Sequence, residues 1–176
     1  MTKRTILNAS DIDRALRRIS HEIVEANSGH QDLVILGIPT RGVSLAERLT
    51  QNLSTISQGQ KVLSGVLDIT LFRDDLAQIQ RGVKPSIIPV EGIENKVVII
   101  VDDVLFSGRT IRAALDALAG IGRPRQVKLA VLVDRGHREL PIRPDFVGKN
   151  LPTAVAERVF VRLSENDGLD EVVIES

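Results

Sequence analysis

The stretch Val97-Val-Ile-Ile-Val-Asp-Asp-Val-Leu-Phe-Ser-Gly-Arg-Thr110 decides the fold. Its first five residues are consecutive aliphatics, which predict a strand that is buried on both faces, as in a parallel sheet. Two adjacent carboxylates, Asp102 and Asp103, stand where this strand should end. A short loop follows, and apolar residues at helical spacing begin at Ile111. The stretch therefore predicts a strand–loop–helix unit.

Such a unit presents free backbone N–H groups at a helix N-terminus, where an anion such as phosphate can bind. Gly108 allows close backbone approach, and Ser107 and Thr110 offer hydroxyl groups. The two carboxylates would accept hydrogen bonds from sugar hydroxyls but repel bare phosphate. An Asp-Asp pair alone could also be a metal site or a solvated pair that caps a helix. Followed by this loop, the pair favours a site for a phosphorylated sugar.

The composition is that of a soluble globular protein. The chain has 176 residues, of which 43% are hydrophobic and 26% charged, and this length predicts a single domain over 1–176. The absence of cysteine excludes disulfides, thiolate nucleophiles and cysteine-based metal sites. The sequence contains neither a signal-peptide pattern nor an apolar run long enough to span a membrane. We therefore expect a cytoplasmic protein with no membrane partner.

Charge is balanced overall but not locally. The 23 basic and 23 acidic residues cancel, so no overall field favours nucleic acid. Between residues 123 and 149, however, seven Lys or Arg residues stand against three acids. This excess is compatible with a basic face without establishing one.

Hydrophobic periodicity predicts strands that alternate with helices. One helix is expected to begin with Ser10 as its N-cap and to bury a stripe that starts at Ile12 and ends at Ile23. A second helix is expected around Leu45, Leu49 and Leu53. Strands are expected at 33–36, 62–72, 97–101, 127–133 and 158–163. This order is typical of an α/β fold with a mainly parallel central sheet and flanking helices.

Two segments lack a sustained period. Residues 73–94 are rich in Asp, Gln, Gly, Pro and Lys, and they predict a flexible lid loop or an exposed hairpin. Residues of about 136–156 are interrupted by prolines and by Gly148, and they predict a small irregular cap.

The stretch at 98–110 resembles the phosphoribosyl-diphosphate signature of type I phosphoribosyltransferases. The resemblance extends to Gly37-Ile-Pro-Thr-Arg-Gly42, to Asp68-Ile-Thr-Leu-Phe-Arg-Asp-Asp75 and to Asp134-Arg-Gly-His-Arg-Glu-Leu-Pro-Ile-Arg143. Together with Gly148-Lys-Asn, these segments cover nearly the whole chain. They resemble the family of bifunctional pyrimidine operon regulators and uracil phosphoribosyltransferases, and the last two segments narrow the resemblance to that family.

The resemblance implies a reaction and a set of site residues. A type I phosphoribosyltransferase fold would transfer phosphoribosyl from phosphoribosyl diphosphate to uracil, and release UMP and diphosphate. Mg²⁺ would arrive chelated to the diphosphate with few direct protein ligands, so we predict no metal-binding residues. The residues with implied catalytic roles are Asp102, Asp103 and Arg41. Those implied for substrate binding are Thr40, Arg41, Gly42, Arg73, Asp74, Val104, Leu105, Phe106, Ser107, Gly108, Arg109, Thr110, Asp134, Arg135 and Val159.

Within that set, the acids would hold the ribose hydroxyls and stabilise the positive charge that develops on the ribose. Residues 105–110 would bind the 5-phosphate, and Thr40 and Arg41 the diphosphate. The base would lie beside Asp134 and Arg135. Phe-Ser replaces the family's common Tyr-Thr at 106–107, and Pro39 replaces a common Lys, which removes one contact near the diphosphate.

The resemblance also implies regulation. A basic dimer face would bind pyrimidine-operon leader mRNA, more tightly with uridine nucleotides such as UMP or UTP, in a homodimer or larger homo-oligomer. The residues implied for RNA binding are Arg18, His21, His137, Arg138, Arg143 and Lys149. With no Trp or Tyr and four Phe, base stacking would rest largely on Arg and His. A solvated basic surface is the plain alternative, and two rival functions are an RNA-binding nucleotide sensor with little catalysis and a purine-base transferase without an RNA role.

Overall fold

The computed structural model describes residues 2–74 and 82–176. In these residues, five strands form one sheet in the order β3-β2-β4-β5-β6, and every neighbouring pair is parallel. These strands are β2 (Leu33–Gly37), β3 (Leu63–Val66), β4 (Val97–Leu105), β5 (Gln126–Asp134) and β6 (Phe146–Asn150). The predicted α/β fold with a parallel central sheet is confirmed.

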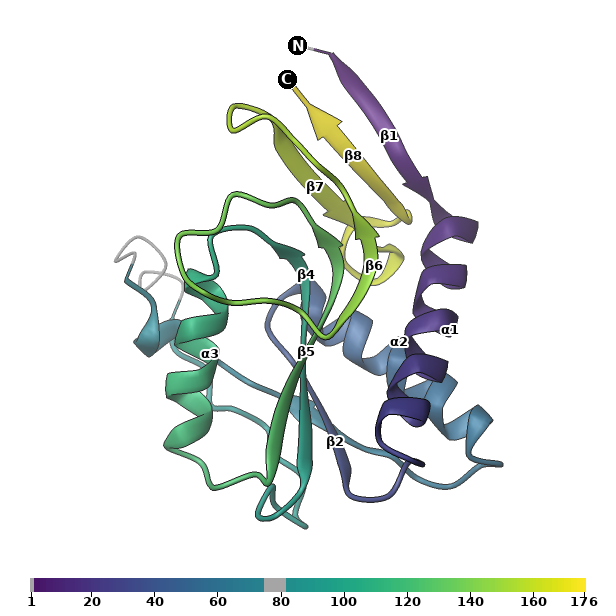
Figure 1. Ribbon diagram of the computed structural model, residues 1–176, viewed down its shortest axis with the longest axis vertical. Helices are drawn as coiled ribbons and strands as arrows, with labels where there is room; N and C mark the ends of the chain where they lie inside the picture. Colours follow the sequence, from purple (N-terminus) through teal and green to yellow (C-terminus); the bar gives the residue numbers. More distant parts are fainter. Residues whose placement is uncertain (1, 75–81) are drawn as a thin grey trace.

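Helices cover both faces of this sheet, as Figure 1 shows. Helices α1 (Ala9–Ala26) and α2 (Arg41–Ile56) lie on one face and α3 (Arg109–Ala119) on the other. The alternation of side chains along β4 explains this arrangement. Val97, Ile99 and Val101 join the core beneath α1 and α2, whereas Val98 and Ile100 join the core beneath α3. The strand is therefore buried on both faces, as its run of aliphatics predicted.

A second, antiparallel sheet has the strand order β1-β8-β7. It contains β1 (Lys3–Asn8), β7 (Arg158–Arg162) and β8 (Glu171–Glu175), and the short helix α4 (Ser164–Asp167) connects its last two strands. The two ends of the described chain meet here, because the Thr2 N–H donates to the Ser176 carbonyl at 3.3 Å (Figure 1). Strand β1 was not predicted, since its two apolar residues are adjacent and give no alternation.

The first helix starts two residues earlier than predicted. Asn8, not Ser10, is the N-cap, and Asn8 and Asp11 form a capping box. The Asp11 N–H donates to Asn8 Oδ1 at 2.9 Å, and the Asn8 N–H donates to Asp11 Oδ2 at 3.0 Å. This reciprocal pair satisfies two backbone donors, which Ser10 does not do. The buried stripe from Ile12 to Ile23 is confirmed.

The predicted strand at 62–72 is wrong beyond residue 66. The Asp68 side chain accepts a hydrogen bond from the Thr70 N–H at 2.9 Å, and the 3-10 turn η1 (Thr70–Phe72) follows. A side chain that bonds to its own backbone two residues on competes with strand pairing. The strands predicted near 33–36, 127–133 and 158–163 are confirmed to within a residue or two.

Part of the segment predicted as an irregular cap is regular. Residues 146–150 form β6, which pairs with β5 at the edge of the main sheet. Gly148 does not break this strand. A Cβ atom there would lie 2.5 Å from the Leu132 carbonyl oxygen, so the glycine permits close approach of the two strands.

Residues 75–81 of the predicted lid lie outside the described residues. After them, Ile87 forms an isolated antiparallel bridge with Val66 of β3. None of the helices in 2–74 and 82–176 is long and apolar enough to cross a membrane.

Candidate active site

The β4–α3 loop (106–108) lies at the carboxyl end of the central strand β4. Gly108 precedes α3 with φ 92°, a left-handed conformation that favours glycine. A Cβ atom there would also contact Leu140 and Ile142 at 3.4 Å. The loop and the first turn of α3 enclose a cavity of about 470 Å³, which we call the loop cavity. It is lined by Arg73, Asp74, Val104, Leu105, Phe106, Ser107, Gly108, Arg109, Thr110 and Ile111.

A second cavity of about 440 Å³ adjoins the first, and we call it the acidic cavity because three carboxylates line it. The two cavities have Arg73, Val104 and Thr110 in common. The acidic cavity is lined by Ile38, Pro39, Thr40, Arg41, Asp68, Thr70, Arg73, Gly82, Lys84, Asp102, Asp103, Val104 and Thr110. Together the cavities offer room for a ligand with an anionic group at each end and a polyhydroxylated centre.

The two acids of β4 lie in different environments. Asp102 is 7% exposed, whereas Asp103 is half-buried. Burial, and then the charge of Asp103, raise the pKa of Asp102 well above its ordinary value. The Asp102 carboxylate accepts a hydrogen bond from the Asp103 N–H at 2.9 Å. Asp102 therefore ionises less readily than an ordinary carboxyl group.

The loop between β2 and α2 forms another wall of the acidic cavity. Close packing of the first turn of α2 fixes the end of this loop, because a Cβ atom on Gly42 would lie 2.5 Å from the Val101 carbonyl oxygen. Thr40 and Arg41 line the cavity, but the Arg41 guanidinium is already engaged. Its Nε donates to Asp167 Oδ2 at 3.0 Å and a terminal nitrogen donates to Asp167 Oδ1 at 2.7 Å. This two-point contact raises the pKa of Arg41 and lowers the pKa of Asp167.

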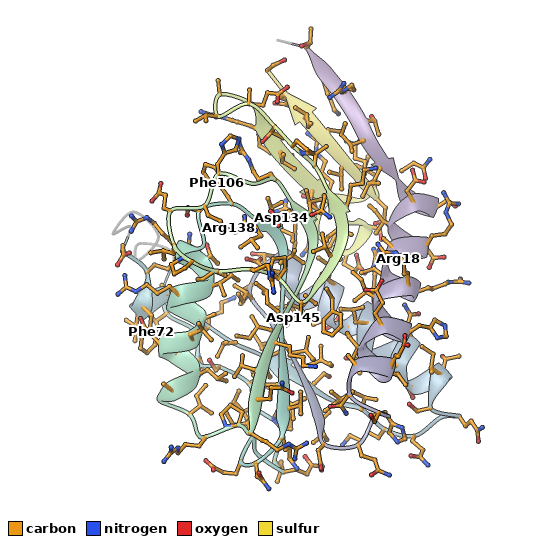
Figure 2. The ribbon with its side chains drawn as sticks, viewed as in Figure 1. Arg18, Phe72, Phe106, Asp134, Arg138 and Asp145 are labelled. Atoms are coloured by element: carbon orange, nitrogen blue, oxygen red, sulfur yellow. The ribbon has the colours of Figure 1, made fainter. Side chains whose placement is uncertain are left out.

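Residues after β5 form an aromatic and cationic cluster beside the β4–α3 loop. The Arg135 guanidinium lies over the Phe106 ring, 4.2 Å from its centroid, and the His137 ring meets Phe106 edge-on at 6.2 Å. Arg135 is 8% exposed and donates to Thr153 Oγ1 at 3.2 Å. Asp134 lies beside this cluster (Figure 2). Neither Asp134 nor Arg135 is among the described residues that line the two cavities.

Arg138 ties three segments together. Its guanidinium donates to the Phe106 carbonyl at 2.9 Å, to the Ile142 carbonyl at 2.8 Å and to Asp134 Oδ2 at 2.6 Å. Burial opposes ionisation of Asp134, but the bonds from Arg138 and from the Gly136 N–H prevail and lower its pKa. Figure 2 shows Arg138, Asp134 and Phe106 close together. Arg138 was predicted to bind RNA, and in the structure it holds the β4–α3 loop.

The rest of this segment also braces the loop. The N–H groups of Glu139 and Leu140 both donate to the Ser107 carbonyl, at 2.9 and 3.1 Å. The Glu139 carboxylate accepts from Arg109 Nε at 2.6 Å. Asp74, at the base of the predicted lid, pairs with Arg109 at 3.3 Å and with Arg112 at 3.1 Å. These contacts join the base of the lid to the first turns of α3.

The residues predicted to bind RNA fall into two groups. Arg18 donates to the carbonyls of Val147 and Gly148 in β6, at 3.0 and 2.7 Å, so it joins α1 to β6 (Figure 2). Arg18 and Arg138 thus use their donors within the molecule. Arg138 is half-buried, whereas Arg18, His21, His137, Arg143 and Lys149 are exposed.

The structure brings most predicted substrate residues together, with exceptions. Val159 lies in β7, packs against the core on the side of α1 and α2, and lines neither cavity. Sequence reasoning missed Asp68 and Lys84 in the acidic cavity and Asp167 as the partner of Arg41. Asp68 lay in a quoted segment, but Lys84 and Asp167 lay in segments without a motif.

Comparison with known proteins identifies the family of the chain. Residues 4–161 match the family model of the phosphoribosyl transferase domain. Bifunctional protein PyrR of Leifsonia xyli subsp. xyli is 59% identical over 180 residues, covering 99% of this chain and 98% of the relative. Bifunctional protein PyrR of Halalkalibacterium halodurans is 53% identical over 176 residues, covering 98% and 97%.

Solved structures share the fold at low identity. A hypoxanthine phosphoribosyltransferase from Trypanosoma cruzi in a ternary substrates complex superposes with a TM-score of 0.75 at 18% identity, covering 98% of this chain and 94% of the other. A hypoxanthine-guanine phosphoribosyltransferase from Bacillus anthracis gives a TM-score of 0.74 at 16% identity, covering 98% of both chains. At such identities the likeness concerns the fold alone. The family model and the near full-length relatives show that this chain belongs to the phosphoribosyl transferase domain family and, within it, to the bifunctional PyrR proteins.

Proposed function

We propose that the protein transfers phosphoribosyl from phosphoribosyl diphosphate to uracil, giving UMP and diphosphate, and regulates pyrimidine biosynthesis genes by UMP-dependent binding to leader mRNA. The observation that carries the enzymatic half is the acid pair Asp102–Asp103 in the acidic cavity, which adjoins the loop cavity. The loop cavity is lined by the loop that turns at Gly108 before the N-terminus of α3, and the acidic cavity is lined by Thr40 and Arg41 as well as by the acids. This spacing suits a sugar with a phosphate on one side and a diphosphate on the other.

The chemistry follows from where charge develops. When diphosphate leaves C1, the ribose gains positive, oxocarbenium-like charge and the leaving group gains negative charge. Asp103 would hold a ribose hydroxyl and place its charge near the developing cation, an electrostatic contribution that water could not preorganise. Asp102, whose pKa is raised, would serve the same sugar mainly by hydrogen bonding.

The two anionic ends would bind to separate walls. Backbone N–H groups and hydroxyls of 105–110 would receive the 5-phosphate. Thr40 and Arg41 would receive the diphosphate, and Arg41 would then exchange its two-point contact with Asp167 for one with phosphate oxygens. The base would lie beside Asp134 and Arg135, with Val159 nearby.

Magnesium fits as a companion of the substrate. The donor set of the acidic cavity is oxygen-rich, with carboxylates from Asp68, Asp102 and Asp103, which suits a hard cation. The described residues contain no cluster of three or more His, Cys, Asp or Glu side chains arranged as a metal site. Bound with diphosphate, the ion would supply charge neutralisation of the leaving group.

Substitution of Asp103 tests the enzymatic half. Asp103→Asn keeps size and hydrogen bonding but removes the charge, and loss of a preorganised electrostatic group costs on the order of a hundredfold in rate. We expect uracil-dependent diphosphate release to fall by about that factor, while the melting temperature stays near that of the wild-type protein. Turnover equal to wild type would refute the role of Asp103.

The regulatory half rests on two exposed cations, Arg143 just before β6 and Lys149 within it. Arg143 and Lys149 are exposed, and no described residue forms an ion pair with either. On a single-stranded RNA, log affinity should fall with log salt at a slope of roughly 0.7 per phosphate contacted. We expect Arg143→Ala with Lys149→Ala to weaken binding of a pyrimidine-leader stem-loop and to reduce that slope, while transferase activity is kept. If the stem-loop binds no better than scrambled RNA even with UMP, the regulatory half fails. A homo-oligomer and a cytoplasmic location are parts of the same proposal.

A further inference from the structure

Lys84 reaches the acidic cavity from a segment that carries no motif. It lines this cavity together with Asp102 and Asp103, although it is distant from them in sequence. Lys84 is exposed, so its ammonium group is accessible to solvent and to a ligand in the cavity. Among the described residues, no carboxylate forms an ion pair with it.

The residues that follow Lys84 are fixed to the sheet. Val66 and Ile87 exchange two backbone hydrogen bonds of 2.8 Å, and the Asp68 N–H donates to Ser86 Oγ at 2.9 Å. The strand β3 accommodates this contact closely, since a Cβ atom on Gly65 would lie 2.1 Å from the Ile87 carbonyl oxygen. Lys84 precedes Ser86 by two residues, so these bonds hold it beside the cavity.

The charges of the acidic cavity point to what Lys84 does. Three carboxylates and three cations line the cavity, and carboxylates oppose the entry of a diphosphate. Of the cations, Arg41 is held by Asp167, and Arg73 lies close enough to Asp102 for its charge to offset a small part of the rise in the pKa of that acid. Lys84 is the cation whose charge is not already balanced by a described partner.

We propose that Lys84 binds the diphosphate of phosphoribosyl diphosphate and helps to stabilise it as it leaves. The ammonium donates hydrogen bonds to phosphate oxygens and offsets the charge of Asp102 and Asp103. It contacts the diphosphate end only, because it lines the acidic cavity and not the loop cavity that would hold the 5-phosphate. This inference rests on the proposed transferase function.

The test uses Lys84→Met in the full chain, with calorimetric titration of inorganic diphosphate, phosphoribosyl diphosphate and UMP in the presence of Mg²⁺. A charge-assisted hydrogen bond at a partly exposed site corresponds to about tenfold in affinity. We expect both diphosphate-containing ligands to bind about tenfold more weakly, and UMP to bind as it does to wild type. Lys84→Arg, which keeps the charge, should retain most of the diphosphate affinity.

Lys61→Met is the matched control. This substitution removes the same charge from an exposed lysine that does not line the cavity and that pairs with Glu91 at 3.8 Å. It should leave all three affinities unchanged. Unchanged diphosphate affinity in Lys84→Met, or an equal loss for UMP, would overturn the inference about Lys84. Failure of the wild-type protein to bind phosphoribosyl diphosphate or to form UMP from uracil would instead overturn the proposed function.

Discussion

Arg138→Ala should weaken the β4–α3 loop far more than its surface position suggests. The substitution removes three hydrogen bonds, to the Phe106 and Ile142 carbonyls and to Asp134. Bonds from a charged donor contribute about 1.5 to 3 kcal/mol each when shielded. The Arg138 side chain is 23% exposed, so we take roughly 1 kcal/mol each and about 3 kcal/mol in total. For a chain of this size that lowers the melting temperature by about 6 to 12 °C.

Thermal unfolding monitored by circular dichroism measures this loss, and Arg143→Ala provides the control. Arg143→Ala removes the same charge from an exposed residue five positions away. It should change the free energy of unfolding by less than about 0.5 kcal/mol. Because the loop would receive the 5-phosphate, Arg138→Ala should also weaken UMP binding. If Arg138→Ala has the same melting temperature as Arg143→Ala and binds UMP as tightly as the wild-type protein, the three bonds do not brace the loop. Loss of RNA binding in Arg138→Ala would then report a direct contact.

Two further predictions concern the acidic cavity. Burial and the charge of Asp103 raise the pKa of Asp102 above its ordinary value of 3.8. The folded state therefore binds the Asp102 proton more tightly than the unfolded state does. As the pH rises from about 4, the free energy cost of ionising Asp102 in the folded state grows until the pH passes the folded-state pKa. Asp102→Asn should therefore be more stable than wild type in denaturant titrations at pH 7, with an advantage that shrinks toward pH 4; a constant difference across this range would contradict the assignment. Arg41→Lys keeps the charge but loses the planar two-point contact, so phosphoribosyl diphosphate should bind at least several-fold more weakly in titration calorimetry while UMP is unaffected. Equal weakening of both ligands would argue against a diphosphate contact.

The parallel sheet and the strand–loop–helix unit could be predicted because local patterns determine them. A run of aliphatics is buried on both faces wherever helices cover both sides of a sheet, and the Asp102–Thr110 stretch carries its own turn and helix start. The strand at 62–72 was overextended because periodicity does not reveal that the Asp68 side chain bonds to its own backbone. Gly148 was taken as a break because the neighbouring Leu132 carbonyl, which explains it, belongs to another strand.

The electrostatic partners within the site could not be predicted for the same reason. The Arg41–Asp167 and Arg138–Phe106 contacts join segments that only the fold brings together. Sequence could assign Arg41 and Arg138 a positive charge, but not the acceptors that use it. Lys84 was overlooked because its position depends on the bridge between Val66 and Ile87.

The sheet that joins β1 to β8 also constrains how the protein is made. Lys3 pairs with Glu175, so the first of these strands has no partner until almost the entire described chain has left the ribosome. Closing a loop of roughly 170 residues costs about 4 to 5 kcal/mol of chain entropy, which the main sheet can reduce by folding first and bringing the ends together. Synthesis and completion of the fold are therefore separated in time. A chain released before β8 would contain Asp102, Asp103 and the β4–α3 loop, yet leave β1 with an unpaired edge open to other chains.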